Sequence, residues 1–140
     1  MKRSGLLFVL LLAPCILIAC SYILDATLFN NTGEAVDVSW GGKSVTITAN
    51  RLAEIHYPVG TLRLAIQIPS TGCEYIYDVP HRIDDYRPDP KLNRGVQIQV
   101  EKDFSINLLP ESYVGEVPAS SEMVLQQEGF PLRPVARKCH

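Results

Sequence analysis

The sequence predicts an all-β domain, an antiparallel β-sandwich of about seven to eight strands over residues 23–109. Two observations predict it. Apolar and polar residues alternate with a period of two in a series of short segments, which is the pattern of a half-buried strand. Gly, Pro and Asn separate these segments at short intervals, as in antiparallel sandwiches. One polar face on each strand fits sheets that have water on one side.

The predicted strands follow one another in short steps. The opening strand is expected at about Leu24 to Asn30. The apolar positions of the strands that follow are, in chain order, Val36/Val38/Trp40, Val45/Ile47/Ala49, Ala53/Ile55/Tyr57, Leu62/Leu64/Ile66/Ile68, Tyr75/Tyr77/Val79, Val96/Ile98/Val100 and Phe104/Ile106/Leu108. Gly41-Gly42 suits a two-residue hairpin turn, and Asn50, Pro58 and Pro69 mark further breaks. Because Trp40 shares its phase with Val36 and Val38, we expect it to be buried. The strand count and size suit an immunoglobulin-like sandwich. The likeness is one of architecture only, since the Cys-Trp-Cys pattern of true immunoglobulin domains is missing.

The N-terminal segment has a different pattern. Lys2 and Arg3 precede an apolar run from residue 6 to residue 18. The motif Leu17-Ile18-Ala19-Cys20 stands at the end of this run. This layout resembles the signal peptide and lipobox of bacterial lipoproteins. The resemblance implies cleavage before Cys20, loss of residues 1–19 and a lipidated N-terminus over residues 20–22. Cys20 would carry a diacylglycerol on its sulfur and an acyl chain on its amino group. Ser21 implies the periplasmic face of the outer membrane, if the source is Gram-negative.

Two other interpretations of this segment fit less well. A transmembrane helix needs about 20 apolar residues, and this run is shorter and contains Pro14. A plain secretory signal fits the charge and length, but it does not account for the cysteine directly after Ala19.

Cys73 and Cys139 remain in the mature chain, and an even pair in an oxidising compartment favours a disulfide. Such a bridge would close a loop of roughly 65 residues and stabilise the fold by roughly 4 kcal/mol in the chain-entropy model. The alternative is two free thiols. In the C-terminal tail, residues 110–140, Ser121–Glu128 suggests a short helix that ends before Gly129. The tail is either docked on the sandwich or loose, and the bridge would favour docking.

The long segment between Pro80 and Gly95 is the candidate partner-binding loop. Loops longer than about 12–15 residues are uncommon in compact domains and are often functional. Tyr and Arg are enriched at binding hot spots, and loops on rigid sandwiches commonly carry binding. The candidate binding residues are His81, Arg82, Asp84, Asp85, Tyr86 and Arg87.

Metal and catalytic motifs have little support. A copper site would draw on His56, His81, His140, Cys73 and Met123, but these lack the close spacing of blue-copper ligands. Asp84, Asp85 and Asp89 lack the ligand order of a calcium loop. No Gly-x-Ser-x-Gly motif is present. We therefore expect no catalytic residues, no metal and no cofactor.

Charge gives a further limit on function. The chain has a formal net charge of −2, and removal of Lys2 and Arg3 leaves the mature part at −4. No cluster of Lys and Arg indicates nucleic-acid binding. We expect a non-catalytic, lipid-anchored interaction or accessory module, with the membrane and an envelope protein as its partners. The alternative is a small-ligand or metal-binding envelope protein, and an envelope hydrolase is a third class.

Overall fold

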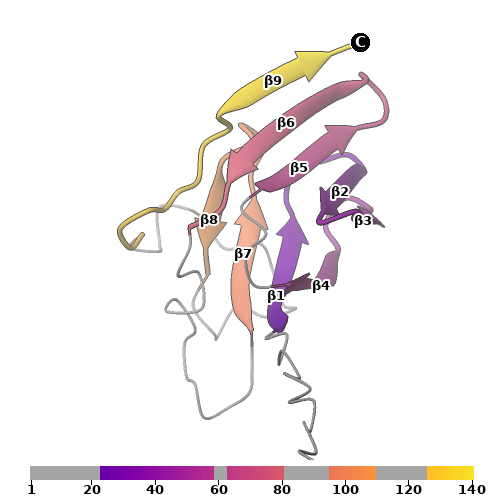
Figure 1. Cartoon of the computed structure of the whole chain (residues 1–140). Helices are drawn as coiled ribbons and strands as arrows, with labels where there is room; N and C mark the ends of the chain where they lie inside the picture. The colour runs from indigo at the N-terminus through magenta and orange to yellow at the C-terminus, as the bar shows by residue number, and fades with distance from the viewer. Residues whose placement is uncertain (1–22, 59–62, 81–94, 110–125) are drawn as a thin grey trace, which may run out of the picture.

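The computed structural model of the chain describes residues 23–58, 63–80, 95–109 and 126–140. These residues form nine strands in two packed sheets (Figure 1). Among them is no helix long and apolar enough to cross a membrane. The expected class, an all-β sandwich, is confirmed.

The four-stranded sheet has the order β4-β1-β7-β8. Its members are β1 (Ile23–Asn30), β4 (Leu52–Pro58), β7 (Val96–Val100) and β8 (Ile106–Leu108). β1 pairs antiparallel with β4 and parallel with β7, and β7 pairs antiparallel with β8. The parallel pair is a departure from the fully antiparallel arrangement that the sequence predicts. β1 and β7 lie far apart in the chain, so the local alternation on which the prediction rests says nothing about their relative direction.

The five-stranded sheet has the order β3-β2-β5-β6-β9 and is antiparallel throughout. Its members are β2 (Val36–Trp40), β3 (Lys43–Ile47), β5 (Arg63–Ile68), β6 (Cys73–Asp78) and β9 (Ala136–Cys139). Gly41 and Gly42 join β2 to β3 with φ angles of 49° and 79°, as a primed hairpin turn requires.

The immunoglobulin-like strand order is not found. An immunoglobulin domain places its first, second, fifth and fourth strands in one sheet. Here the first strand lies between the fourth and the seventh, and the second lies in the other sheet. Each of the hairpins β2–β3, β5–β6 and β7–β8 stays within one sheet. The supported class is therefore a two-sheet β-sandwich with its own strand order.

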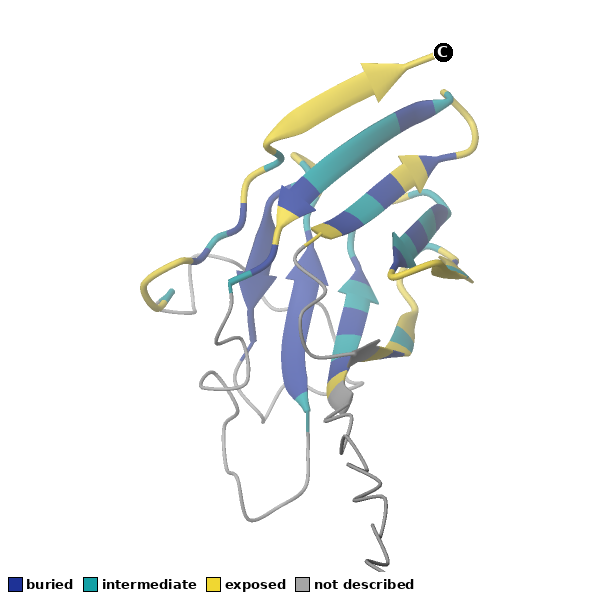
Figure 2. Ribbon diagram, viewed as in Figure 1, coloured by how far each residue is buried: buried dark blue, intermediate teal, exposed yellow. Residues whose placement is uncertain are grey.

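The core lies between the two sheets, where the inward phases of the strands meet (Figure 2). Trp40 is only 6% exposed, and Val36 and Val38 beside it are fully buried, as the phase of their strand predicts. The Trp40 indole Nε1 donates a hydrogen bond of 2.8 Å to the backbone oxygen of His56. This bond links the two sheets because Trp40 belongs to β2 and His56 to β4.

β7 and β8 differ from the expected half-buried strands. Every residue of both strands is buried, including Gln97, Gln99 and Asn107 on the outer face. The Gln99 and Asn107 amides donate to the Glu101 carboxylate at 2.6 and 3.0 Å, which offsets part of the cost of burying them. Phe104, expected in the last strand, lies in the β7–β8 turn with a φ of 60°.

The described part of the C-terminal tail is docked on the sandwich. Phe130 and Leu132 are buried in the core, and Leu132 exchanges two backbone hydrogen bonds of 2.8 and 2.9 Å with Ile106 of β8. The sandwich therefore extends beyond residue 109. The expected helix over Ser121–Glu128 is not found in the described part, Gln126 to Glu128, and residues 121–125 lie outside the described residues.

Candidate interaction surface at the C-terminal strand

β9 is the edge strand of the five-stranded sheet, and all four of its residues are exposed (Figure 2). One side of β9 pairs with β6, from Ile76 opposite Ala136 to Cys73 opposite Cys139. Within the described part of the chain, no strand pairs with its other side. β9 therefore presents a strand edge that is open to a partner.

A disulfide fixes the far end of β9. Cys73 and Cys139 lie directly across from one another with their Cα atoms 4.0 Å apart, and their sulfur atoms are bonded. At the other end, the Val135 N–H donates to the Ile76 carbonyl at 2.7 Å. The disulfide prediction is confirmed, and the strand is held on β6 at both ends.

Arg137 lies over Tyr75, which is one of two stacked aromatic rings beside β9. Its guanidinium carbon lies 5.5 Å from the centre of the Tyr75 ring, within the range of a cation–π interaction. The Tyr75 ring stacks on Phe104 with a centroid distance of 4.0 Å and an interplanar angle of 8°. Because Tyr75 lies on β6 and Phe104 in the β7–β8 turn, the stack joins the two sheets beneath the edge strand.

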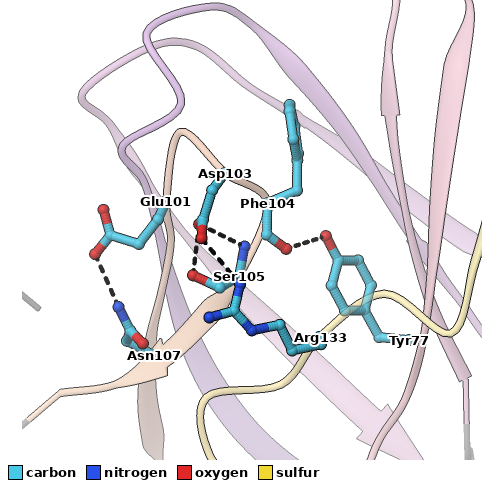
Figure 3. A network of polar contacts seen from close by, with 7 residues as sticks. All are labelled: Tyr77, Glu101, Asp103, Phe104, Ser105, Asn107 and Arg133. Carbon is cyan, nitrogen blue, oxygen red and sulfur yellow. Dashed lines mark hydrogen bonds and ion pairs between the residues drawn. The ribbon is translucent and has the colours of Figure 1, made fainter.

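The β7–β8 turn carries a polar network that reaches the tail (Figure 3). Asp103 accepts hydrogen bonds from the Ser105 hydroxyl at 2.6 Å and the Ser105 N–H at 3.0 Å, and it pairs with Arg133 at 3.1 Å. The hydrogen bonds from Ser105 and the charge of Arg133 lower the pKa of Asp103. The network positions the tail just before β9, although an exposed pair such as Arg133–Asp103 contributes little stability by itself.

Tyr77 anchors the same turn from the core. Its buried hydroxyl donates a hydrogen bond of 2.7 Å to the backbone oxygen of Phe104, as Figure 3 shows. Burial raises the pKa of Tyr77, and the nearby Tyr75 and Asp103 raise it further. The tyrosine therefore stays protonated and keeps donating to the turn.

The tail that leads into β9 is cationic. Between Phe130 and His140 the chain contains Arg133, Arg137 and Lys138 and no Asp or Glu. The carboxylates nearest in register come from other elements: Asp103 pairs with Arg133, and Glu74 lies across from Lys138. Arg137 and Lys138 are consecutive strand residues, so their side chains point to opposite faces of the sheet.

Among the residues singled out from the sequence, the structure brings together Cys73 and Cys139. Cys20 and the loop candidates His81, Arg82, Asp84, Asp85, Tyr86 and Arg87 lie outside the described residues. Gly95, which follows that loop, lies against the backbone of Asp25 near the start of β1.

The candidate copper ligands are not brought together among the described residues. Cys73 is in a disulfide and offers no thiolate. His56 lies exposed on the outer face of β4, with its Nδ1 atom 2.6 Å from the Asp25 carboxylate. The described ranges contain no group of three or more His, Cys, Asp or Glu residues that could hold a metal ion.

A second concave surface lies beside the β2–β3 turn. It is an open hollow of about 460 Å³. Small residues form its floor, Ser44, Ser39 and Ala65, which lie in one row across β3, β2 and β5. Lys43 and Arg63 flank it.

Comparisons with protein-family models, with curated proteins and with solved structures find no match to this chain.

β9 and its cations are the part of this surface that the sequence did not predict. The segment Ala136–Cys139 lacks both period-two alternation and β-branched residues. The one signal in the sequence was three cations without an acidic residue over the last eleven positions. Its meaning depends on strand pairing with β6, which lies more than fifty residues earlier in the chain.

Proposed function

We propose that this chain is a lipid-anchored interaction module of the cell envelope, held by Cys20 and binding a protein partner through its sandwich. The observation that carries the proposal is the exposed edge of β9, which the disulfide and the contact of Arg137 with the Tyr75 ring hold in place. A rigid exposed edge is a feature of binding modules, since it offers a partner a template that needs no reordering. The lipobox supports the anchor, and Ser21 supports the periplasmic face of the outer membrane if the source is Gram-negative.

The arrangement of the sandwich is compatible with an anchor at one end and a binding edge at the other. β1 begins at the bottom of the view in Figure 1, and β9 lies along the top. Cys20 precedes Ile23 by three positions, and an extended chain of that length spans at most about 11 Å. A lipid on Cys20 would therefore hold the start of β1 close to the membrane. The edge of β9 would then face away from the membrane, toward soluble or membrane-bound partners.

Photo-crosslinking in cells tests this function. A photoreactive residue replaces Lys138 on β9, Tyr86 in the candidate loop, or Thr46 on β3 as a control on the same sheet. We expect discrete adducts with an envelope protein from position 138 or position 86, and their loss when Cys20→Ala prevents anchoring. If no position gave a discrete adduct, the interaction function would be wrong.

The hollow beside the β2–β3 turn favours a second candidate function, the binding of a small ligand. Lys43 and Arg63 at its rim would suit an anionic group, and Ser39 and Ser44 offer hydroxyls at its floor. Native mass spectrometry of protein purified from the envelope discriminates between the two functions. A stoichiometric small molecule that is lost in an Arg63→Gln variant would support the ligand-binding function.

A further inference from the structure

We propose that the open edge of β9 binds an extended acidic segment of a partner protein, which adds to the five-stranded sheet as a sixth strand. The inference rests on the proposed function, because it names the kind of partner that this module would bind. Three properties of β9 lead to it: its backbone, its charge and its fixed position.

The backbone of an edge strand is a template for another strand. Among the strands of the described ranges, none neighbours its outer side, and an extended peptide can satisfy the N–H and C=O groups there by strand addition. The chain covers the comparable edge of β8 with its own residues: the Gln126 side chain accepts from the Leu108 N–H at 2.8 Å and donates to the Leu108 oxygen at 3.1 Å. Leu132 also bonds to Ile106. No such cover lies on β9 within the described residues.

The charge of β9 selects the occupant. Arg137 and Lys138 point to opposite faces of the sheet, so an added strand meets a cation on each face. Opposite charges directly across from one another stabilise strand pairing, and like charges destabilise it. A second copy of this chain, paired β9 to β9, would place cations against cations. An acidic segment would instead place carboxylates opposite Arg137 and Lys138.

The fixed position of β9 lowers the cost of binding. The Cys73–Cys139 bond and the contact of Arg137 with the Tyr75 ring hold the strand on β6 before any partner arrives. A binding surface that is already ordered loses less conformational entropy when the partner binds. The bound strand would lie beside β9, on the side of the sandwich away from the start of β1 (Figure 1).

A peptide titration tests the inference on the full lipidated protein in detergent micelles. The probe is a fluorescent eight-residue peptide in which pairs of Glu alternate with pairs of Val, so that carboxylates lie on both faces of the added strand. The control is the matching peptide with Lys in place of Glu. We expect the acidic peptide alone to bind by fluorescence anisotropy, and more weakly as salt is raised. Amide hydrogen exchange with the acidic peptide bound should slow at β9, because strand addition forms backbone hydrogen bonds there.

Two double variants locate the binding. Arg137→Gln with Lys138→Gln should weaken acidic-peptide binding at least about tenfold. Lys43→Gln with Arg63→Gln removes two cations from the same sheet and should leave the affinity within about twofold of the parent. Exchange of the Ile76 amide, whose residue faces β9, should stay as slow as in the parent when no peptide is present, which checks that the first double variant keeps β9 paired.

Three results would overturn the inference: no binding of the acidic peptide, binding without slower exchange at β9, or equal weakening in both double variants. These results differ from a failure of the proposed function. Discrete crosslinks from position 86 with a negative peptide titration would leave the interaction module standing and remove only the β9 site.

Discussion

At the residue scale, Gly95 is the position with the least room for a side chain. A Cβ atom there would lie 1.8 Å from the backbone oxygen of Asp25 and 2.3 Å from its carbonyl carbon. Both are backbone atoms, so no side chain can move aside. Gly95 directly precedes the parallel pairing of β7 with β1, in which Val96 lies opposite Ala26. Glycine is therefore required for the two strands to approach.

We predict that Gly95→Ala lowers the free energy of unfolding by about 3 kcal/mol, at the upper end of the usual cost of overpacking. Urea denaturation followed by circular dichroism measures it. Gly33→Ala is the matched control, because Gly33 has a φ of 94° and a Cβ atom there would meet nothing within 4 Å. Its cost should be about 1–2 kcal/mol, from the backbone conformation alone. Equal effects in the two variants would contradict the close approach at Gly95.

Trp40 tests the predicted phase of β2. Truncation of a buried aromatic residue typically costs about 3–5 kcal/mol, so Trp40→Ala should destabilise the fold by that amount. Leu52→Ala, at a leucine that is 40% exposed, should cost much less. Urea denaturation of both variants checks the difference. If Trp40→Ala unfolded no more easily than the parent, Trp40 would not be a core residue.

Tyr77 makes the fold sensitive to alkaline pH. Burial raises its pKa in the folded state, so its contribution to stability is present below the unfolded value of about 10 and is lost as pH rises above it. Tyr77→Phe removes the hydrogen bond to the Phe104 oxygen, which costs about 1 kcal/mol at pH 7. The variant should lose less stability than the parent between pH 9 and pH 11. Parallel curves in urea denaturation at these pH values would contradict this role.

At the element scale, β7 and β9 mark the limits of prediction from the sequence. The alternation of Val96, Ile98 and Val100 correctly predicted a strand and its core face. It carried no information on whether the other face is covered, and so the burial of Gln97 and Gln99 was missed. β9 has no local pattern that predicts a strand, because its strand conformation comes from pairing with β6 and from the disulfide. Such pairing can override local strand preference.

The turns also divide into those that the local sequence predicts and those that depend on long-range contacts. Gly41 and Gly42 were predicted correctly as a hairpin turn, because glycine tolerates the positive φ angles that a primed turn requires. The alternation predicts a strand at Phe104, since its spacing from Ile106 continues the pattern. In the structure it adopts a φ of 60°, which is rare for a bulky residue. Its stacking on Tyr75 and the hydrogen bond from Tyr77 are long-range contacts that the sequence does not reveal.

The Cys73–Cys139 bond should stabilise the fold and hold β9 in place. Cys139→Ser should destabilise the protein by roughly 4 kcal/mol in the chain-entropy model, since the bonded residues are 66 positions apart. Hydrogen exchange should become faster at the Lys138 amide, which faces β6. The double variant Cys73→Ser with Cys139→Ser should cost little more than the single variant, because the bond is already lost. Unchanged stability and exchange in Cys139→Ser would show that the bond does not hold β9.

At the scale of the whole molecule, the two ends of the sandwich have different roles in the proposed function. β1 begins at the bottom of the view in Figure 1 and the edge of β9 lies along the top, and a lipid on Cys20, as proposed, would be three positions from the start of β1. The sequence predicted the anchor and the disulfide pair. It could not predict that the tail completes the sandwich, since Phe130 and Leu132 reach the core through long-range contacts such as the Leu132–Ile106 hydrogen bonds.

The central claim is that the mature chain begins with a lipidated Cys20 and closes its C-terminal strand with a disulfide. Intact mass spectrometry of protein from the membrane fraction, alkylated without reduction, tests both parts in one measurement. The predicted mass is that of residues 20–140 with lipid on Cys20, no alkyl groups and two hydrogens fewer than the reduced form. A chain that starts at Met1, a Cys20 without lipid, or alkylation of Cys73 and Cys139 would contradict the claim.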